Sequence, residues 1–301
     1  MRNFNTNPRI KAPGKVLLLV FAFIAIMGLA CDLGGLIPFG VSLGQPAATR
    51  DKLYDGIIYE RIVRQEPRLM VIHVVTVDLK AEGIKLLVTP GDADNELPLQ
   101  ARTTTEFVEG FDVQLAINGD AFTPWQDLGP LGYTPKSGER VSPIGFAASN
   151  GSIYSQDTDE EPTLYLYQSN LGSLNGLVGK IYNAISGNAL LVWNGAIVEG
   201  LNSSDAEPRT AVGLDRGGRK LIIVVVDGRQ AGYSQGATLA ELAQILLDNK
   251  AHNGMNMDGG GSSTLAVQRP NGEIELLNSP VHQGIAGRER PVGNHLGIKA
   301  K

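Results

Sequence analysis

Three aspartates stand in similar settings in this sequence, each behind an apolar stretch and beside a glycine. Asp120 follows LAING, Asp227 follows IIVVV and Asp258 follows GMNM. Strand ends that enter glycine turns are where clefts collect polar groups, because the scaffold is rigid and the backbone can approach a ligand there. A single Asp-Gly pair would be an ordinary turn. Three carboxylates in the same setting favour a site that does chemistry.

The residues after Asp258 predict what such a site would hold. Three glycines and then three hydroxyl residues follow it: Gly259, Gly260, Gly261, Ser262, Ser263 and Thr264. Consecutive glycines cost conformational entropy, but their backbone N–H groups can converge into a nest that an anion approaches closely. The run lacks the lysine of a nucleotide P-loop and does not match a G-x-S-x-G nucleophile elbow. A phosphate nest with one adjacent carboxylate fits better.

Arginines could complete a phosphate site. Arg209, Arg229 and Arg290 are candidates to clamp phosphate oxygens bidentately. Arg229 stands two residues after Asp227, in the triplet Asp-Gly-Arg. Surface ion pairing is the alternative role for each of them.

Composition excludes several function classes. The chain has 301 residues, of which 43% are hydrophobic and 19% charged, so it can bury a sizeable core. Its formal net charge of −5 gives no basic excess, and we expect no nucleic acid among its partners. Cys31 is the only cysteine, which excludes an internal disulfide and a cysteine-ligated zinc site.

The N-terminus predicts export or membrane anchoring. Arg2, Arg9, Lys11 and Lys15 precede an uninterrupted apolar run over residues 16–30. Cys31 then ends the sequence GLAC, which resembles a lipoprotein box except for its glycine three positions earlier. Lipidation of Cys31, an uncleaved signal anchor and ordinary signal cleavage all remain open. Each places the remainder of the chain outside the cytoplasm.

The remainder predicts one α+β domain, with a mixed, mostly antiparallel sheet core and a few packed helices. We assign residues 1–31 to the signal or anchor, 32–56 to a linker and 57–301 to the domain. Strand-like runs cover residues 57–63, 69–79, 84–89, 113–118, 144–148, 164–167, 190–193, 210–214 and 221–229.

Helices and one hairpin complete the expected elements. A short helix is predicted over 103–108, and Thr238 with Glu241 has capping-box spacing at the start of a helix over 238–249. Asn249 and Gly254 are its stop signals. A hairpin is predicted between 264–268 and 273–277 through Pro-Asn-Gly.

Several segments together resemble the phosphodiester glycosidase family. The most specific is MNMDGGGSST, preceded by VVDGR and YSQGATLAELAQILLD; the others are AINGDAF, EPRTAVGLD and RPVGNHLGI. The resemblance spans residues 57–301 in matching order. It implies hydrolysis of a sugar-1-phosphodiester at its glycosidic bond, which would release a free sugar and a phosphomonoester, in envelope or exopolysaccharide metabolism.

The same resemblance implies the site residues. The family motifs fall on Asn118, Gly119, Arg209, Asp227, Gly228, Arg229, Asp258, Gly259, Gly260, Gly261, Ser262 and Ser263. The first motif departs from the common Asn-Gly-Gly-Tyr-Phe form, because Asp120 and Ala121 replace its second glycine and its tyrosine. That change adds a carboxylate and removes an aromatic ring, which bears on substrate preference.

The mechanistic hypothesis assigns the central role to Asp258. It would support the anomeric carbon or activate water at an oxocarbenium-like transition state, with Asp227 or Asp120 as its partner. The glycine nest and the arginines would hold the phosphate. The sequence indicates no certain cofactor, and a divalent cation held by Asp120 and Asp258 is an alternative. A non-catalytic protein that binds phosphorylated glycans, or a transferase rather than a hydrolase, would use similar residues.

The remaining chemistry-bearing side chains give weaker signals. His73, His252, His282 and His295 have no metal-ligand spacing and are expected to be structural or on the surface, with His295 a candidate to border the cleft. Trp125 follows the first motif, and its ring is expected either to pack or to stack on a sugar.

Overall fold

The computed structural model describes residues 47–126, 132–156 and 160–301. The predicted signal or anchor segment, with Cys31, lies outside the described residues. Within those ranges, no helix is both long enough and apolar enough to span a bilayer.

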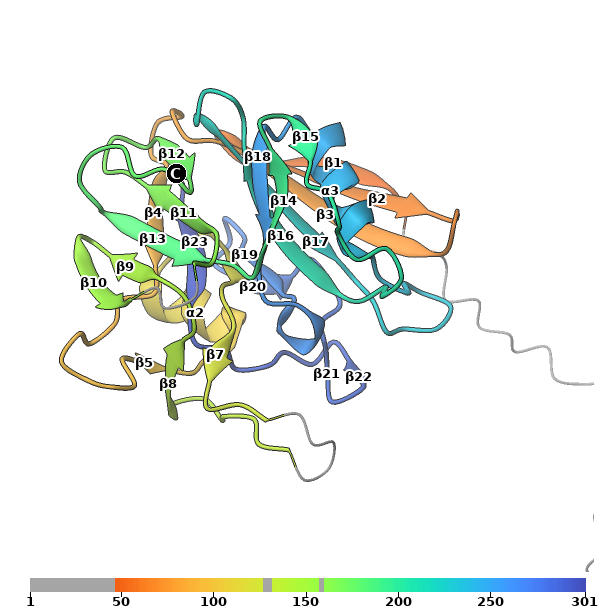
Figure 1. The fold of residues 1–301 in the computed structure, drawn as a ribbon. Coiled ribbons are helices and arrows are strands. Elements are labelled where there is room, and N and C mark those ends of the chain that lie inside the picture. Colours follow the sequence, from red (N-terminus) through yellow and green to blue (C-terminus); the bar gives the residue numbers. More distant parts are fainter. Residues whose placement is uncertain (1–46, 127–131, 157–159) are drawn as a thin grey trace, which may run out of the picture. The chain divides into compact units, whose positions relative to one another are not determined.

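The largest element is an eight-stranded sheet in the order β1-β2-β3-β17-β16-β18-β14-β15 (Figure 1). Its strands, in that order, are Thr49–Tyr54, Ile57–Arg64, Met70–Asp78, Lys220–Val226, Arg209–Leu214, Asn253–Asn256, Ala189–Trp193 and Ala196–Ile197. All seven neighbouring pairs are antiparallel.

Two five-stranded sheets are also antiparallel throughout. One has the order β20-β19-β6-β23-β4, with strands Ile274–Leu276, Leu265–Gln268, Leu115–Asn118, His295–Lys299 and Lys85–Val88. The other has the order β10-β9-β13-β11-β12, with strands Ser152–Ser155, Ala147–Ser149, Asn183–Ser186, Thr163–Leu166 and Gly172–Leu174. Smaller sheets join β5 (Leu99–Gln100), β8 (Arg140–Pro143) and β7 (Phe122–Thr123), and β21 (Val281–His282) with β22 (Ile285–Ala286).

Helices cover the outer faces of the sheets. Helix α3 (Leu239–Asp248) packs on the eight-stranded sheet, and α2 (Thr104–Phe111) packs on β6, β19, β20 and β23. Both helices begin with a capping box, formed by Thr103 with Glu106 and by Thr238 with Glu241. The two helices and the capping box of the second therefore lie where the sequence predicted them. A short 3₁₀ helix, η2 (Gly260–Ser262), follows β18.

The core forms between the large sheet and the two five-stranded sheets. Strand β17 shows how this works, because its side chains alternate between two buried clusters. Leu221, Ile223 and Val225 face the core between the sheets. Ile222 and Val224 face the cluster formed with helix α3. Burial on both faces explains the continuous apolar run, and it confirms the prediction for this strand.

Side chains cap the outer edge of strand β4. The backbone carbonyls of three alternate residues accept hydrogen bonds from side chains of the neighbouring sheet and loop. The pairs are Ile84 with Asn170 Nδ2 (2.7 Å), Leu86 with Asn183 Nδ2 (3.0 Å) and Val88 with Ser149 Oγ (2.7 Å). These bonds connect the two five-stranded sheets where no backbone ladder does.

The fold confirms the mostly antiparallel core but is richer in sheet than an α+β protein usually is. Only two α-helices occur within the described ranges. Residues 49–54, inside the segment expected to be a linker, instead form edge strand β1. The strand expected at 144–148 is displaced, since β9 covers Ala147–Ser149. Gly254 lies within β18 rather than ending the preceding helix.

Candidate active site

Two of the three aspartates follow strands of the large sheet that end on the same side of the sheet. Strand β16 separates β17 from β18 and is antiparallel to both, with Arg209 opposite Val226 and Ala211 opposite Asn256. The carboxyl ends of β17 and β18 therefore lie beside the start of β16. Asp227 follows the first end and Asp258 the second.

Asn118, at the end of β6, connects these strand ends to the five-stranded sheet that contains β6. Its Nδ2 donates to the Asp258 carbonyl (2.7 Å), and its Oδ1 accepts from Thr210 Oγ1 (2.8 Å) and Thr264 N (3.2 Å). The Asp258 amide in turn donates to the Gly119 carbonyl (3.0 Å). Asn118 is fully buried. It therefore positions the Asp258 turn rather than meeting a ligand.

Asp258 is the least buried of the three aspartates, since its residue is partly exposed while the other two are buried. Its Oδ1 accepts from the Gly259 amide (2.8 Å) and its carboxylate also bonds to the Ser262 hydroxyl. Burial raises the pKa of Asp258, and the Ser262 hydrogen bond, the charge of Arg290 and the Gly259 amide offset this only in part. A carboxyl group with a raised pKa is a candidate for a role at a reaction centre.

Several backbone amides around the glycine run are occupied by protein acceptors, which leaves fewer donors for the predicted nest. Gly260 N donates to the Pro208 carbonyl (2.8 Å), Ser262 N to Gly259 (3.2 Å) and Ser263 N to Gly260 (3.3 Å). With the Gly259 amide bound to Asp258, four amides of the turn already have protein acceptors. An anion would therefore be held mainly by other groups.

Arginine side chains supply those groups, and each lies against one glycine of the run. The pairs are Gly259 with Arg209, Gly260 with Arg229 and Gly261 with Arg290. In each pair a guanidinium nitrogen lies within 4.0 Å of the point where a Cβ would stand. At Gly261 that distance is 2.7 Å, and Gly260 also has a positive φ of +60°. The glycines thus make room for three cations around the Asp258 turn.

The arginines are held by surrounding acceptors. Arg209 Nε donates to the Ala237 carbonyl (3.1 Å), and burial lowers the pKa of this guanidinium. Arg229 pairs through Nε with the Glu207 carboxylate, and its side chain is 49% exposed. Arg290 Nη1 donates to Ser262 Oγ (3.2 Å). Because Ser262 also bonds to Asp258, Arg290 is connected to the carboxylate through one hydroxyl.

His282 orients Arg290, a role that its sequence context did not indicate. Its Nδ1 lies 3.3 Å from Arg290 Nε, and the residue is buried. Burial, with the charges of Arg290 and Arg288, lowers the pKa of His282 to about 4. The imidazole is therefore neutral at pH 7 and accepts the Arg290 hydrogen bond. No motif or spacing around His282 predicts this.

Asp227 is saturated with hydrogen bonds. Its Oδ1 accepts from Asn278 Nδ2 (3.0 Å) and Ser279 N (2.9 Å). Its Oδ2 accepts from Tyr233 OH (3.0 Å) and lies 2.9 Å from His73 Nε2. Asp227 is only 1% exposed. These bonds favour a positioning role, in which Asp227 fixes two loops and strand β3 behind the site.

Asp120 is likewise committed to the backbone. Its Oδ1 accepts from Ala121 N (2.7 Å) and its Oδ2 from Gly145 N (2.8 Å), while its own amide donates to Asn294 Oδ1 (2.8 Å). It is 1% exposed. This geometry does not fit the metal hypothesis for Asp120 and Asp258, and no cluster of three or more His, Cys, Asp or Glu side chains in the described ranges is arranged as a metal site.

The family assignment follows from a match over most of the domain. The family model described as phosphodiester glycosidase matches residues 111–299. The chain belongs to the phosphodiester glycosidase family. All of the aspartates, arginines and glycines described above lie within the matched range.

Relatives of this phosphodiester glycosidase domain include a curated protein and solved structures. N-acetylglucosamine-1-phosphodiester alpha-N-acetylglucosaminidase from Bos taurus is 44% identical over 59 residues, which span 20% of this chain and 11% of that protein. The zebrafish catalytic domain of the same name, auto-inhibited by its pro-peptide, is 20% identical with a TM-score of 0.58, over 86% of this chain and 85% of the other.

A bacterial structure shares the same fold. The putative exported protein from Burkholderia pseudomallei K96243 has a TM-score of 0.59 at 12% identity, covering 88% of this chain and 98% of the other. At such low identities the two structural matches establish the fold of this phosphodiester glycosidase domain and leave its substrate to proposal.

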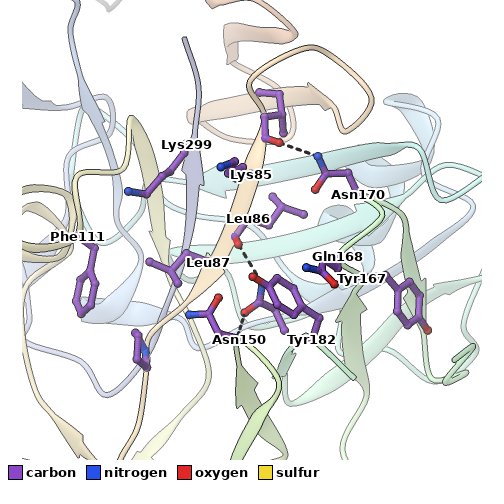
Figure 2. A pocket seen from close by; sticks show the side chains of 13 residues that line it. Lys85, Leu86, Leu87, Phe111, Asn150, Tyr167, Gln168, Asn170, Tyr182 and Lys299 are labelled. Atoms are coloured by element: carbon purple, nitrogen blue, oxygen red, sulfur yellow. Dashed lines mark hydrogen bonds between the residues drawn. The ribbon is translucent and has the colours of Figure 1, made fainter. Parts of the chain in front are cut away.

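A separate pocket of about 580 Å³ lies beside β4, away from the family motifs (Figure 2). Its lining includes Lys85, Lys299, Tyr167 and Tyr182, and none of the predicted site residues. His295 is also absent from the candidate site: it is fully buried and stacks on Phe107, with ring centroids 4.7 Å apart. It does not border a cleft.

Proposed function

We propose that this chain is an extracytoplasmic hydrolase that cleaves the glycosidic bond of a sugar-1-phosphodiester in envelope or exopolysaccharide metabolism. The observation that carries the proposal is the half-buried Asp258 carboxylate, whose adjoining turn is surrounded by three guanidinium groups. A carboxylate beside a cluster of cations suits a substrate in which an electrophilic sugar carbon adjoins a phosphate.

The arginines would act on the leaving group. They would bind the phosphodiester anion and stabilise the second negative charge that develops as the bond between C1 and the phosphate oxygen breaks. A phosphate is already a good leaving group, so strong general-acid assistance is not needed. Arg290 would serve twice, because it reaches Ser262 and its charge also favours the ionised form of Asp258.

Asp258 would act on the sugar. As positive charge builds at C1, the ionised carboxylate would stabilise it or take a proton from the attacking water. The oxygen of water then becomes the C1 hydroxyl of the free sugar, and the original bridging oxygen leaves with the phosphomonoester. Asp227 and Asp120, both buried among hydrogen bonds, would hold the turns in place.

The test is hydrolysis of a panel of sugar-1-phosphodiesters in water enriched with ¹⁸O. We expect reducing sugar and phosphomonoester in equal amounts, with the label in the sugar. Label in the phosphate would show cleavage of the P–O bond and would replace the proposal with an ordinary phosphodiesterase. Supplying an alcohol acceptor in the same reaction distinguishes glycosyl transfer from hydrolysis.

A second candidate is a non-catalytic protein that binds phosphorylated glycans. The observation in its favour is that Asp120 and Asp227 are both held in hydrogen bonds, which leaves one open carboxylate among the three. Calorimetric binding of the same diesters, unchanged in Asp258→Asn and without product from the wild type, would favour it. Loss of product in Asp258→Asn with binding retained would favour the hydrolase.

The extracytoplasmic location rests on the predicted signal or anchor over residues 1–31. Cell fractionation of the full chain tests it, and Cys31→Ser distinguishes the tethers. A lipoprotein would lose its acyl groups and change in mass with this substitution, whereas a signal anchor would keep the same mass apart from the replaced atom. Recovery of the wild-type chain in the cytoplasm would contradict the proposal.

A further inference from the structure

Trp125 lies next to the cationic part of the site. Trp125 follows β7 in the loop after the Asn118 motif and is 38% exposed. The guanidinium carbon of Arg290 lies 5.3 Å from the centroid of the Trp125 ring, within the range of a cation–π contact. A large aromatic surface is therefore open to solvent beside a group that we assign to phosphate binding.

Arg290 connects the two regions. Its guanidinium crowds the Cα of Gly261 and donates to Ser262 Oγ, and the same group faces the indole. A phosphate bound by Arg290 would thus have Asp258 and the Ser262 hydroxyl near one side and the Trp125 ring near another. A group attached to that phosphate on the Trp125 side would lie close to the indole ring.

An open pocket of about 400 Å³ begins at this ring. It is lined by Thr123, Pro124, Trp125, Gln126 and Tyr133. Its size falls within the usual range for small-ligand sites. The space therefore suits one or two sugar units rather than a phosphate alone.

The lining is anchored at both ends of the loop. Gln126 and Tyr133 exchange backbone hydrogen bonds of 3.0 and 2.9 Å. The Tyr133 hydroxyl donates to Glu139 (2.7 Å), and Tyr133 is 40% exposed. Tyr133 is thus held on the pocket by bonds that do not use its ring faces, and the Trp125 ring is held beside it by Arg290.

We propose that Trp125 is the platform on which a pyranose ring of the substrate stacks, with the attached phosphate on Arg290. The proposal rests on the function proposed above and adds to it the residue that recognises the sugar ring. One face of a pyranose presents C–H groups, which pack on an indole, while its hydroxyl groups keep their contact with water. Trp125 is then a specificity residue, because a ring without an apolar face would not stack.

A simpler role for Trp125 is to pack against Arg290 and hold it in place. The two roles differ in what they require of the ligand. Stacking needs the sugar, whereas packing affects every anion that Arg290 binds. The chain offers a convenient control, because it has only two tryptophans and Trp193, on β14, is 39% exposed.

Tryptophan fluorescence tests the stacking directly. Trp193→Phe leaves Trp125 as the only tryptophan, and Asp258→Asn in the same protein prevents turnover. We expect methyl α-glucopyranosyl phosphate to change the emission of this variant, and dimethyl phosphate to leave it nearly unchanged. Trp125→Phe with Asp258→Asn, which retains Trp193, should respond to neither. Equal responses to the two diesters, or no response where calorimetry shows binding, would overturn the proposal.

Kinetics provides a second measurement. Trp125→Ala should raise KM for glycosyl phosphodiesters by about tenfold, the upper range for one aromatic contact, and leave inhibition by inorganic phosphate unchanged. Trp193→Ala is the matched control and should change neither. A parallel weakening of phosphate inhibition would show that Trp125 only holds Arg290. A sugar-dependent fluorescence change without any hydrolysis would retain the platform and reject the hydrolase.

Discussion

The turns after β17 and β18 have the same sequence pattern and opposite environments. Each places an Asp-Gly pair at the end of a buried strand, and the two strands end on the same side of one sheet. Asp227 has four hydrogen-bond partners and is 1% exposed. Asp258 is half-buried and bonded to one backbone amide and one hydroxyl.

The difference shows what separates a structural carboxylate from a reactive one. A carboxylate with four hydrogen-bond partners has its oxygens committed to the protein. Asp258 has fewer partners and its residue is partly exposed, so it can meet a ligand with less disturbance of the protein. Substitutions in the two turns should therefore separate activity from stability.

The largest effect is expected for Asp258→Asn. Activity on glycosyl phosphodiesters should fall by about 1000-fold or more, because the amide can neither stabilise positive charge nor accept a proton. Burial raises the pKa of Asp258, so ionisation at pH 7 costs folding free energy, and the melting temperature should be equal or higher. Activity close to wild type would end the assignment.

Asp227→Asn should mainly lower the stability of the protein rather than act directly on catalysis. The amide group would turn its N–H donors toward groups that already donate, and the free energy of unfolding should fall by about 2 to 3 kcal/mol. Chemical denaturation measures this, with Asp258→Asn as the matched comparison. Complete loss of activity with unchanged stability would instead make Asp227 a catalytic partner of Asp258.

Gly261→Ala should weaken anion binding without touching a carboxylate. A Cβ there would lie 2.7 Å from Arg290, which must move away from Ser262. Loss of a charged hydrogen bond predicts about 10- to 100-fold weaker inhibition by inorganic phosphate. Gly110→Ala in helix α2 has open space around it and serves as the control. Equal inhibition constants in all three proteins would show that Arg290 does not bind the anion.

Acid should destabilise the protein through two histidines. Burial lowers the pKa of His282 to about 4 and that of His295 to about 3, from an ordinary value of 6.5. Between pH 6.5 and these values the unfolded chain binds protons that the folded chain does not, so stability falls as the pH falls. Replacing His282 with Gln should flatten this dependence in a series of melting curves. An unchanged slope would contradict the buried neutral imidazole.

The smallest effect is expected for Glu207→Gln. Glu207 pairs with Arg229 at a partly exposed site, so it competes with an incoming anion for that guanidinium. Removing its charge should strengthen phosphate inhibition by about two- to fivefold, and added salt should reduce the difference. Weaker inhibition would mean that Glu207 holds Arg229 in its binding position.

Local signals in the sequence predicted much of the fold. The β-branched run of β17 and the capping-box spacing of Thr238 and Glu241 identify elements that tertiary contacts leave in place. Strand β1 was missed because TRDKLY is mostly exposed at a sheet edge and carries no apolar alternation. Its pairing with β2 is a tertiary interaction that the local pattern does not encode.

The sequence predicted only those parts of the candidate site that short sequence motifs encode. The motif around Asp258 and the arginines lie together, as expected, but the direction of the glycine amides depends on backbone angles such as the positive φ of Gly260. His282 lies on β21, whereas Asn278 and Tyr233 lie in loops, and nothing in the sequence around them indicates their contacts with Asp227 or Arg290. Such contacts become visible only after the strands are ordered in space.

The capped edge of β4 has a consequence for association between molecules. A free sheet edge offers unpaired backbone groups to a strand of another chain, and it can thereby start aggregation. Along β4 three outward carbonyls are already occupied by Asn170, Asn183 and Ser149. Amide and hydroxyl side chains from the same chain thus take the positions that an incoming strand would need. At high concentration, this edge resists intermolecular sheet extension.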